Sequence, residues 1–152
     1  MKTPRCLLPL LCSLLVFSTS GVLAKSGWTD DYEKAVAQAK QEKKIVLVDF
    51  TGSDWCGWCI KLDKEVFAKP AFKTYAKDKL VLVEIDFPQA KKLPRKKEEA
   101  NEALQQKYGV EGFPTVIVLD SEGKKIGQLG YVKGGPEAFI AELEKITAKT
   151  GA

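Results

Sequence analysis

The stretch "VDFTGSDWCGWC" (Val48–Cys59) decides how this chain is interpreted, because it ends in two cysteines three positions apart. The apolar run that leads into it is rich in β-branched residues, which is typical of a strand buried on both faces. Thr51–Ser53 then turn the chain, and we expect a helix from about Cys56. A cysteine pair in this place can be a metal clip, a structural staple or a redox centre.

The first residues predict export. Residues 1–24 read "MKTPRCLLPLLCSLLVFSTSGVLA", with Lys2 and Arg5 before an apolar centre and small residues up to Ala24. This is the layout of a secretory signal peptide that is cleaved after about Ala24. The apolar centre is short for a membrane anchor. We therefore expect residues 25–152 to form a single domain.

Cleavage would leave 128 residues with Cys56 and Cys59 as their cysteines and no histidine, and the net charge would fall from +4 to +2. So small a charge gives no argument for a nucleic-acid partner. An exported protein meets an oxidising compartment, in which thiol pairs cycle and disulfides persist.

The residue types around the pair favour the redox interpretation. A structural zinc site needs four ligands, and the cleaved chain offers two thiols. A disulfide that closes so short a loop removes little entropy from the unfolded chain. At a helix start, however, backbone N–H groups and the helix dipole stabilise a thiolate, and such thiols have pKa values of roughly 3.5–7.5. We therefore expect Cys56 to be an exposed nucleophile and Cys59 to resolve the mixed disulfide.

The rest of the chain alternates helices with strands, which indicates the α/β class with a mixed sheet. We expect a first helix from Trp28, capped by Thr29 or Asp30, because apolar residues recur there at helical spacing. The other expected elements are strands at 43–50, 79–87 and 113–120, helices from Cys56, Pro70 and Pro94, a hairpin partner at 125–132, and a last helix after Pro136.

Two landmarks resemble the thioredoxin superfamily: "VDFTGSDWCGWC" and, downstream, "GVEGFPTVIVLD", in which a proline precedes the third strand. The likeness covers about Trp28 to Ile146. A narrower resemblance is to exported thioredoxin-like proteins, including the C-terminal domain of the thiol-disulfide interchange protein DsbD. The resemblance implies a thioredoxin fold, with a central mixed β-sheet flanked by helices, and disulfide exchange without a cofactor or metal.

The resemblance also implies roles for single residues. Pro114 matches the family's cis-proline, which with Phe113 borders the substrate groove. Asp49 matches a buried acid that exchanges a proton with the resolving cysteine. It stands seven residues before Cys56, whereas the usual spacing is six, and Leu82 stands where the family has a lysine near this acid. Both departures put its reach to Cys59 in question.

Two tryptophans flank the motif. Trp55 matches the aromatic residue that serves the family as a lid or docking surface. Trp58, between the cysteines, either contacts partner proteins or lies on its own helix, and the sequence leaves both open.

Compared with the family, the chain has an insertion around Phe87–Arg95, before the third main helix. It follows the carboxyl end of a strand, where loops of parallel sheets line the functional crevice. Its basic residues either select an acidic partner surface or form a solvated helix start: Lys91, Lys92, Arg95, Lys96 and Lys97.

We therefore predict an exported thiol-disulfide oxidoreductase of the bacterial periplasm, acting on protein thiols and disulfides with a redox partner protein. We expect a monomer that meets a membrane only through such a partner. The DsbD-like character favours the reductase direction, while isomerase and oxidase remain open. The alternative is a non-catalytic thioredoxin-fold binding or metal-delivery module that uses the cysteine pair as a ligand.

Overall fold

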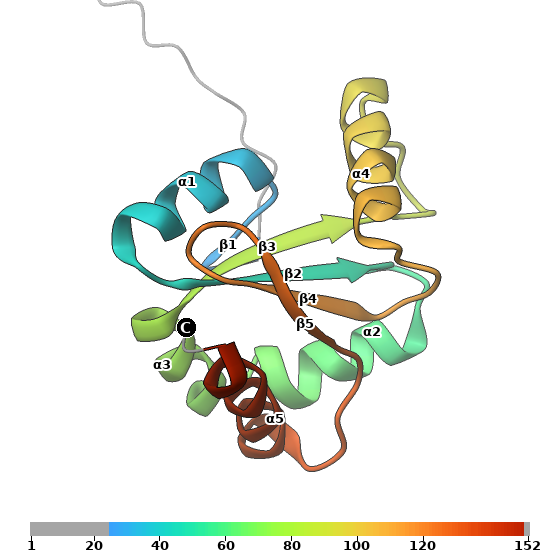
Figure 1. Cartoon of the computed structure of the whole chain (residues 1–152). Coiled ribbons are helices and arrows are strands. Elements are labelled where there is room, and N and C mark those ends of the chain that lie inside the picture. Colours follow the sequence, from blue (N-terminus) through green and yellow to red (C-terminus); the bar gives the residue numbers. More distant parts are fainter. Residues whose placement is uncertain (1–24, 151–152) are drawn as a thin grey trace, which may run out of the picture.

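A computed structural model describes residues 25–150, and the predicted signal peptide, residues 1–24, lies outside the described residues (Figure 1). The strands are β1 (Trp28–Thr29), β2 (Ile45–Thr51), β3 (Leu80–Asp86), β4 (Thr115–Leu119) and β5 (Lys125–Leu129). The helices are α1 (Tyr32–Glu42), α2 (Gly57–Leu62), the π-helix η1 (Asp63–Phe67), α3 (Pro70–Lys79), α4 (Arg95–Tyr108) and α5 (Gly135–Thr150).

The strands form one mixed sheet in the order β1-β3-β2-β4-β5. β3 runs parallel to β1 and β2, whereas β4 runs antiparallel to β2 and β5. β2 is central, so its residues are covered on both faces, as its apolar sequence predicts. The carboxyl ends of β2 and β3 lie side by side, because Thr51 pairs with Asp86.

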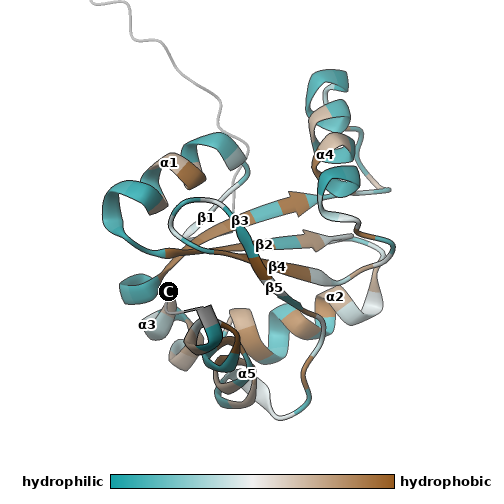
Figure 2. Cartoon of the chain, in the orientation of Figure 1, coloured by the Kyte–Doolittle hydropathy of each residue, from teal (hydrophilic) through white to brown (hydrophobic). Residues whose placement is uncertain are grey.

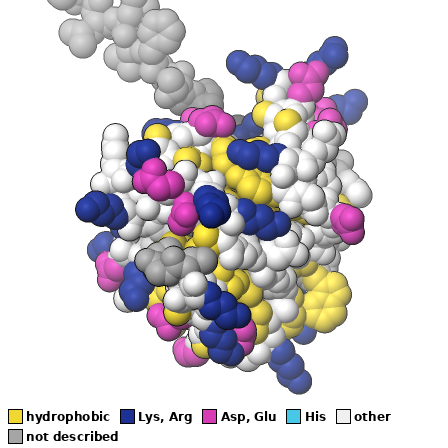
Figure 3. Space-filling view, in the orientation of Figure 1, with side chains coloured by type: hydrophobic (Ala, Val, Ile, Leu, Met, Phe, Trp, Pro, Cys, Tyr) yellow, Lys and Arg dark blue, Asp and Glu magenta, His cyan; other side chains and the backbone are white. Residues whose placement is uncertain are grey.

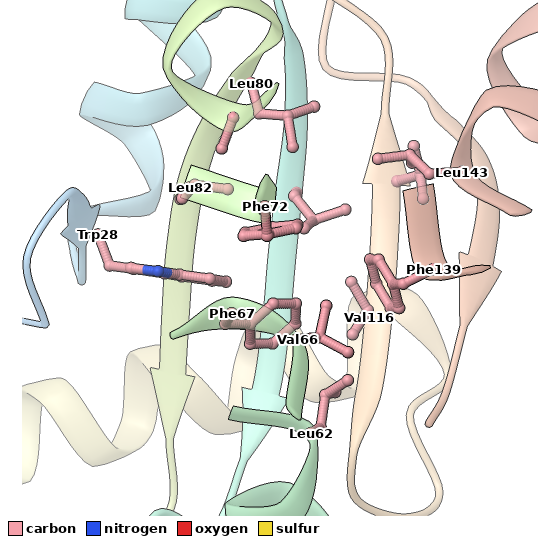
Figure 4. Packing of buried hydrophobic residues seen from close by; sticks show 13 residues of the cluster. Trp28, Leu62, Val66, Phe67, Phe72, Leu80, Leu82, Val116, Phe139 and Leu143 are labelled. Atoms are coloured by element: carbon pink, nitrogen blue, oxygen red, sulfur yellow. The ribbon is translucent and has the colours of Figure 1, made fainter. Parts of the chain in front are cut away.

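Helices lie on both faces of this sheet, and its strands are largely apolar in sequence (Figure 2). Alternate residues of β2 divide between two cores, since side chains of a strand point in turn to opposite faces. Val46, Val48 and Phe50 pack with α1 and Tyr108. Leu47, on the other face, joins aromatic residues of η1, α3 and α5: Phe67, Phe72 and Phe139 (Figure 4).

The expected fold class is confirmed, but the first element differs from the prediction. Trp28 and Thr29 do not begin a helix; they pair with Leu82 and Val83 as strand β1. The helix begins at Tyr32, and Asp31 caps it by accepting a hydrogen bond from the Lys34 N–H. The Trp28 ring packs on Phe67 in the core at the edge of the sheet. Trp28 is therefore apolar because it is buried there, and not because it belongs to the apolar face of α1.

One further difference concerns the helices. The helix expected from Cys56 passes without a break into η1, a π-helical turn. The helix expected from about Pro94 is present as α4, with Pro94 as its N-cap. No helix within residues 25–150 combines the length and apolar character that crossing a membrane requires.

Candidate active site

The cysteine pair lies where β2 gives way to α2. Cys56 and Cys59 form a disulfide, and Cys56 is the N-cap of α2. The Cys56 Sγ accepts a hydrogen bond from the Cys59 N–H at 3.2 Å, so an otherwise unpaired helix donor points at this sulfur. The exposed fractions of the two side chains are 7% and 4%. The expectation of an exposed Cys56 is therefore wrong for the disulfide form, and the helix position distinguishes the two cysteines instead.

The turn before the helix depends on Gly52. The N–H groups of Trp55 and Cys56 both donate to the Gly52 carbonyl. The Trp55 indole lies over this glycine so closely that a Cβ added there would stand 2.4 Å from its Cε2. Only a residue without a side chain fits under the ring, so the glycine fixes both the turn and the place of Trp55.

Trp55 connects the motif to two distant segments. Its Nε1–H donates to the Phe87 carbonyl at 2.7 Å, and its ring packs edge-on against Phe113 at a centroid distance of 6.0 Å. Phe87 stacks on Phe113 as well, at 5.1 Å. The Phe113–Pro114 peptide bond is cis, and the strand β4 begins one residue later, at Thr115. The structure thus brings three predicted site residues together: Trp55, Phe113 and Pro114.

The insertion is tied to the same turn. The Ser53 N–H and Oγ donate to the Asp86 carboxylate at 2.9 and 2.7 Å, and Gln89 and Ala90 donate their backbone N–H groups to Asp54. These two backbone bonds lower the pKa of Asp54. The loop after β3 therefore borders the cysteine motif through Ser53 and Asp54.

A cavity of about 360 Å³ lies at the resolving cysteine, and both Cys59 and Asp49 line it. The extra residue between Asp49 and Cys56 therefore does not remove the acid from the resolving cysteine. Asp49 is 4% exposed, and its Oδ1 has no hydrogen-bond partner within the described part of the chain. Burial above all raises its pKa to about 7, with smaller contributions from the nearby acids Glu84, Asp63 and Asp86.

One feature that sequence reasoning missed is the counter-charge of this cavity. Lys25 reaches in from the residues before β1 and forms an ion pair with Asp63. Its ammonium group also lies 4.4 Å from the Trp28 ring centroid and lowers the pKa of Asp49. Lys25 thus supplies, from another segment, the positive charge that Leu82 cannot supply.

Glu84 was also missed, although the sequence held a signal for it. It interrupts the apolar run of β3 and pairs in register with Asp49 on β2. Burial raises its pKa too. Asp63 carried a signal of the same kind, because it follows Cys59 by four residues and so shares its side of the helix.

Trp58 points to another surface. Its side chain is 58% exposed, and its ring packs on Tyr131 at a centroid distance of 5.2 Å. In Figure 3 a large hydrophobic group stands out from the edge of the molecule at which α2 begins. Among the described residues, no group of three or more Cys, Asp or Glu side chains could hold a metal ion.

A disulfide at a helix N-cap, a buried carboxyl in the cavity that its second cysteine lines, and this strand order together define a thioredoxin-type disulfide-exchange protein. The family comparison agrees: the model of the thioredoxin-like domain matches residues 32–147, and the chain belongs to that family.

Relatives narrow the class. The chain is 36% identical over 115 residues to the disulfide bond reductase DsbH of Chlamydia pneumoniae, covering 76% of this chain and 69% of the relative. A solved DsbH oxidoreductase structure superposes with a TM-score of 0.72 at 32% identity, covering 84% of this chain and 92% of that one.

DsbD of Cronobacter sakazakii is 34% identical over 109 residues, which is 72% of this chain but 17% of the relative. The expected resemblance is confirmed, and the protein is a thiol-disulfide oxidoreductase.

Proposed function

We propose that the protein is an exported disulfide reductase that works on proteins in the bacterial periplasm as a monomer. The observation that carries the proposal is the Cys56–Cys59 disulfide at the start of α2, whose Cys59 lines the same cavity as the buried acid Asp49. The similarity to a protein named disulfide bond reductase supports the direction. The signal-peptide pattern of residues 1–24 supports export.

The reaction starts from the dithiol form. The Cys56 thiolate attacks one sulfur of a substrate disulfide, which releases the first substrate thiolate and forms a mixed disulfide. Cys59 then attacks Cys56 Sγ, which releases the second substrate thiolate and closes the Cys56–Cys59 disulfide. Two electrons have passed to the substrate, and a partner dithiol returns them to the protein.

Each remaining site residue has a task in this sequence. Asp49, with its pKa raised to about 7, accepts the Cys59 proton as that thiol becomes the attacking thiolate. The backbone beside Pro114 pairs with an extended substrate strand. Trp55 and Phe113, which pack on each other, form the apolar wall of that groove.

The basic residues of the insertion contribute less to partner selection than their charge suggests. Arg95 pairs with Glu99, and Lys97 pairs with Asp30 on the first loop. Lys91 lines the cavity under Cys59. Figure 3 shows Lys and Arg side chains at the α4 end of the molecule with acidic side chains among them. A solvated helix start therefore describes most of this segment.

A redox titration of the purified protein against glutathione tests the direction. A reductase gives a potential near that of thioredoxin, about −270 mV, whereas an oxidase lies near −120 mV. A pair that never exchanges with any disulfide would remove the proposed function. For export, mass spectrometry of the periplasmic fraction checks whether the chain begins at Lys25, and sedimentation checks the monomer.

A further inference from the structure

A groove is lined at one end by Trp58, the residue that stands between the two cysteines in the sequence. It encloses about 620 Å³, within the range of pockets that bind ligands. Gly134 and Gly135 both have positive φ, so the chain turns at the groove wall without side chains. Its lining comes from α2, η1, the N-cap of α3, the segment after β5 and the first residues of α5: Trp58, Lys61, Glu65, Lys69, Tyr131, Lys133 and Gly134–Pro136.

One side of the groove is an aromatic pair. The Trp58 and Tyr131 rings lie 5.2 Å apart at an angle of 51°, and the Lys61 ammonium stands 5.0 and 5.1 Å from their centroids. The Tyr131 hydroxyl donates to the Glu65 carboxylate. Aromatic side chains held this way offer a large contact area at small conformational cost, as in binding hot spots.

The charge of the groove is positive. Lys61, Lys69 and Lys133 line it against a single acid, Glu65, and that carboxylate is already engaged by Tyr131. Within the described part of the chain Lys69 and Lys133 form no ion pair, and Lys61 lies over the two rings. Complementary charge speeds encounter and fixes the register of a bound segment.

We propose that this groove binds an acidic, extended segment of a protein substrate, next to the cysteine that forms the mixed disulfide with Cys56. The inference rests on the proposed function, because the segment belongs to the protein whose disulfide is reduced. It assigns Trp58 to partner recognition, one of the two roles that the sequence left open. A small apolar or aromatic residue within the acidic segment would lie on the Trp58–Tyr131 pair.

The test uses residues 25–152 with the cysteine pair fully reduced and excess reductant removed. Three peptides carry the same internal disulfide, flanked by Asp and Glu, by Ser and Asn, or by Lys. Single-turnover rate constants for their reduction are measured by mass spectrometry of acid-quenched samples at two salt concentrations. We expect the acidic peptide to react about tenfold faster than the basic one at low salt, and the ratio to shrink as salt screens the charges.

The variant Lys61→Glu/Lys69→Glu/Lys133→Glu should abolish or invert the preference. A control variant, Lys34→Glu/Lys77→Glu/Lys149→Glu, changes the net charge equally with exposed lysines on α1, α3 and α5 that do not line the groove. It should keep the preference. Trp58→Ala should slow the acidic peptide more than the others. Circular dichroism of each variant establishes that it is folded.

Equal rates for the three peptides, or a preference that survives the groove variant, would overturn the inference. The inference would also fail if the groove variant changed only the sedimentation of the protein in the absence of peptide, because a second copy of the chain would then be the occupant of the groove. Reduction of the uncharged 2-hydroxyethyl disulfide distinguishes a failure of the groove inference from a failure of the proposed function. If the dithiol protein reduces neither it nor any peptide, the proposed function fails as well.

Discussion

The ammonium group of Lys25 forms an ion pair with Asp63, which joins the segment before β1 to the helix that follows the cysteines. The same cavity wall holds Asp49 and Glu84, whose pKa values are both raised by burial. Lys25 acts through these acids and does not touch the sulfurs, so it is a positioning residue. Its charge lowers the pKa of Asp49 against the larger effect of burial.

Replacing Lys25 by Gln should therefore raise the pKa of Asp49 above about 7, because a charge that lowers it is removed. The pH dependence of mixed-disulfide resolution, followed by single-turnover kinetics, should move to higher pH. Lys34→Gln, an exposed residue of α1, is the matched control and should leave the profile in place. An unmoved profile for Lys25→Gln would show that this charge does not reach Asp49.

Asp49 should also give stability a pH dependence of definite sign. Its pKa is about 7 in the fold and near 3.9 in the unfolded chain, so the folded state holds the extra proton. The contribution of this group to the free energy of unfolding is therefore fully present below pH 4 and is lost as the pH rises from about 4 to about 7. Over three pH units the loss is roughly 4 kcal/mol.

Urea titrations of the disulfide form measure this effect. Relative to the parent protein, Asp49→Asn should become progressively more stable between pH 4 and pH 8. Asp78→Asn removes the same charge from the exposed side of α3 and should show no such trend. Parallel pH curves for the parent and Asp49→Asn would contradict a raised pKa.

The two cysteines should differ in what they trap. With Cys59→Ser, Cys56 attacks a substrate disulfide but nothing resolves the product, so a mixed disulfide accumulates. With Cys56→Ser, the nucleophile at the helix N-cap is lost, and adducts should fall by at least about tenfold. Non-reducing electrophoresis with mass spectrometry counts the adducts. Equal trapping by both variants would remove the assignment of roles.

Gly52→Ala should disturb the place of Trp55, since its Cβ would stand 2.4 Å from the indole. We expect a loss of about 1–3 kcal/mol in the free energy of unfolding, typical of overpacking. Gly57→Ala is the control, because a Cβ there meets nothing within 4 Å. Alanine within α2 should keep or slightly raise stability. Equal effects of the two substitutions would show that the ring does not depend on Gly52.

Sequence patterns predicted those parts of the molecule that local rules determine. The buried strands β2 and β3 followed from apolar runs, and the cysteine motif was placed at a helix start by the turn before it. Trp28 and Thr29 were misassigned because helical spacing continued through them, whereas pairing with β3 decides their conformation. Two residues cannot form a recognisable strand pattern.

The charge network around Asp49 was largely beyond sequence reasoning for a related reason. Lys25 lies 24 positions before Asp49, and only the packing of β1 beside β3 brings it to the cavity. Tyr131 reaches Trp58 in the same manner, from the segment after β5. Such contacts depend on how distant segments meet, and no spacing within one segment records them.

The position of Lys25 has a practical consequence for anyone who purifies the protein. A tag or linker joined to this residue would begin at the wall of the cavity under Cys59, and its charges would add to those that act on Asp49. The carboxyl end of α5 lies toward α3, at the opposite side of the fold from the start of α2 (Figure 1). Affinity handles therefore belong at the C-terminus when redox potentials or pH profiles are to be compared.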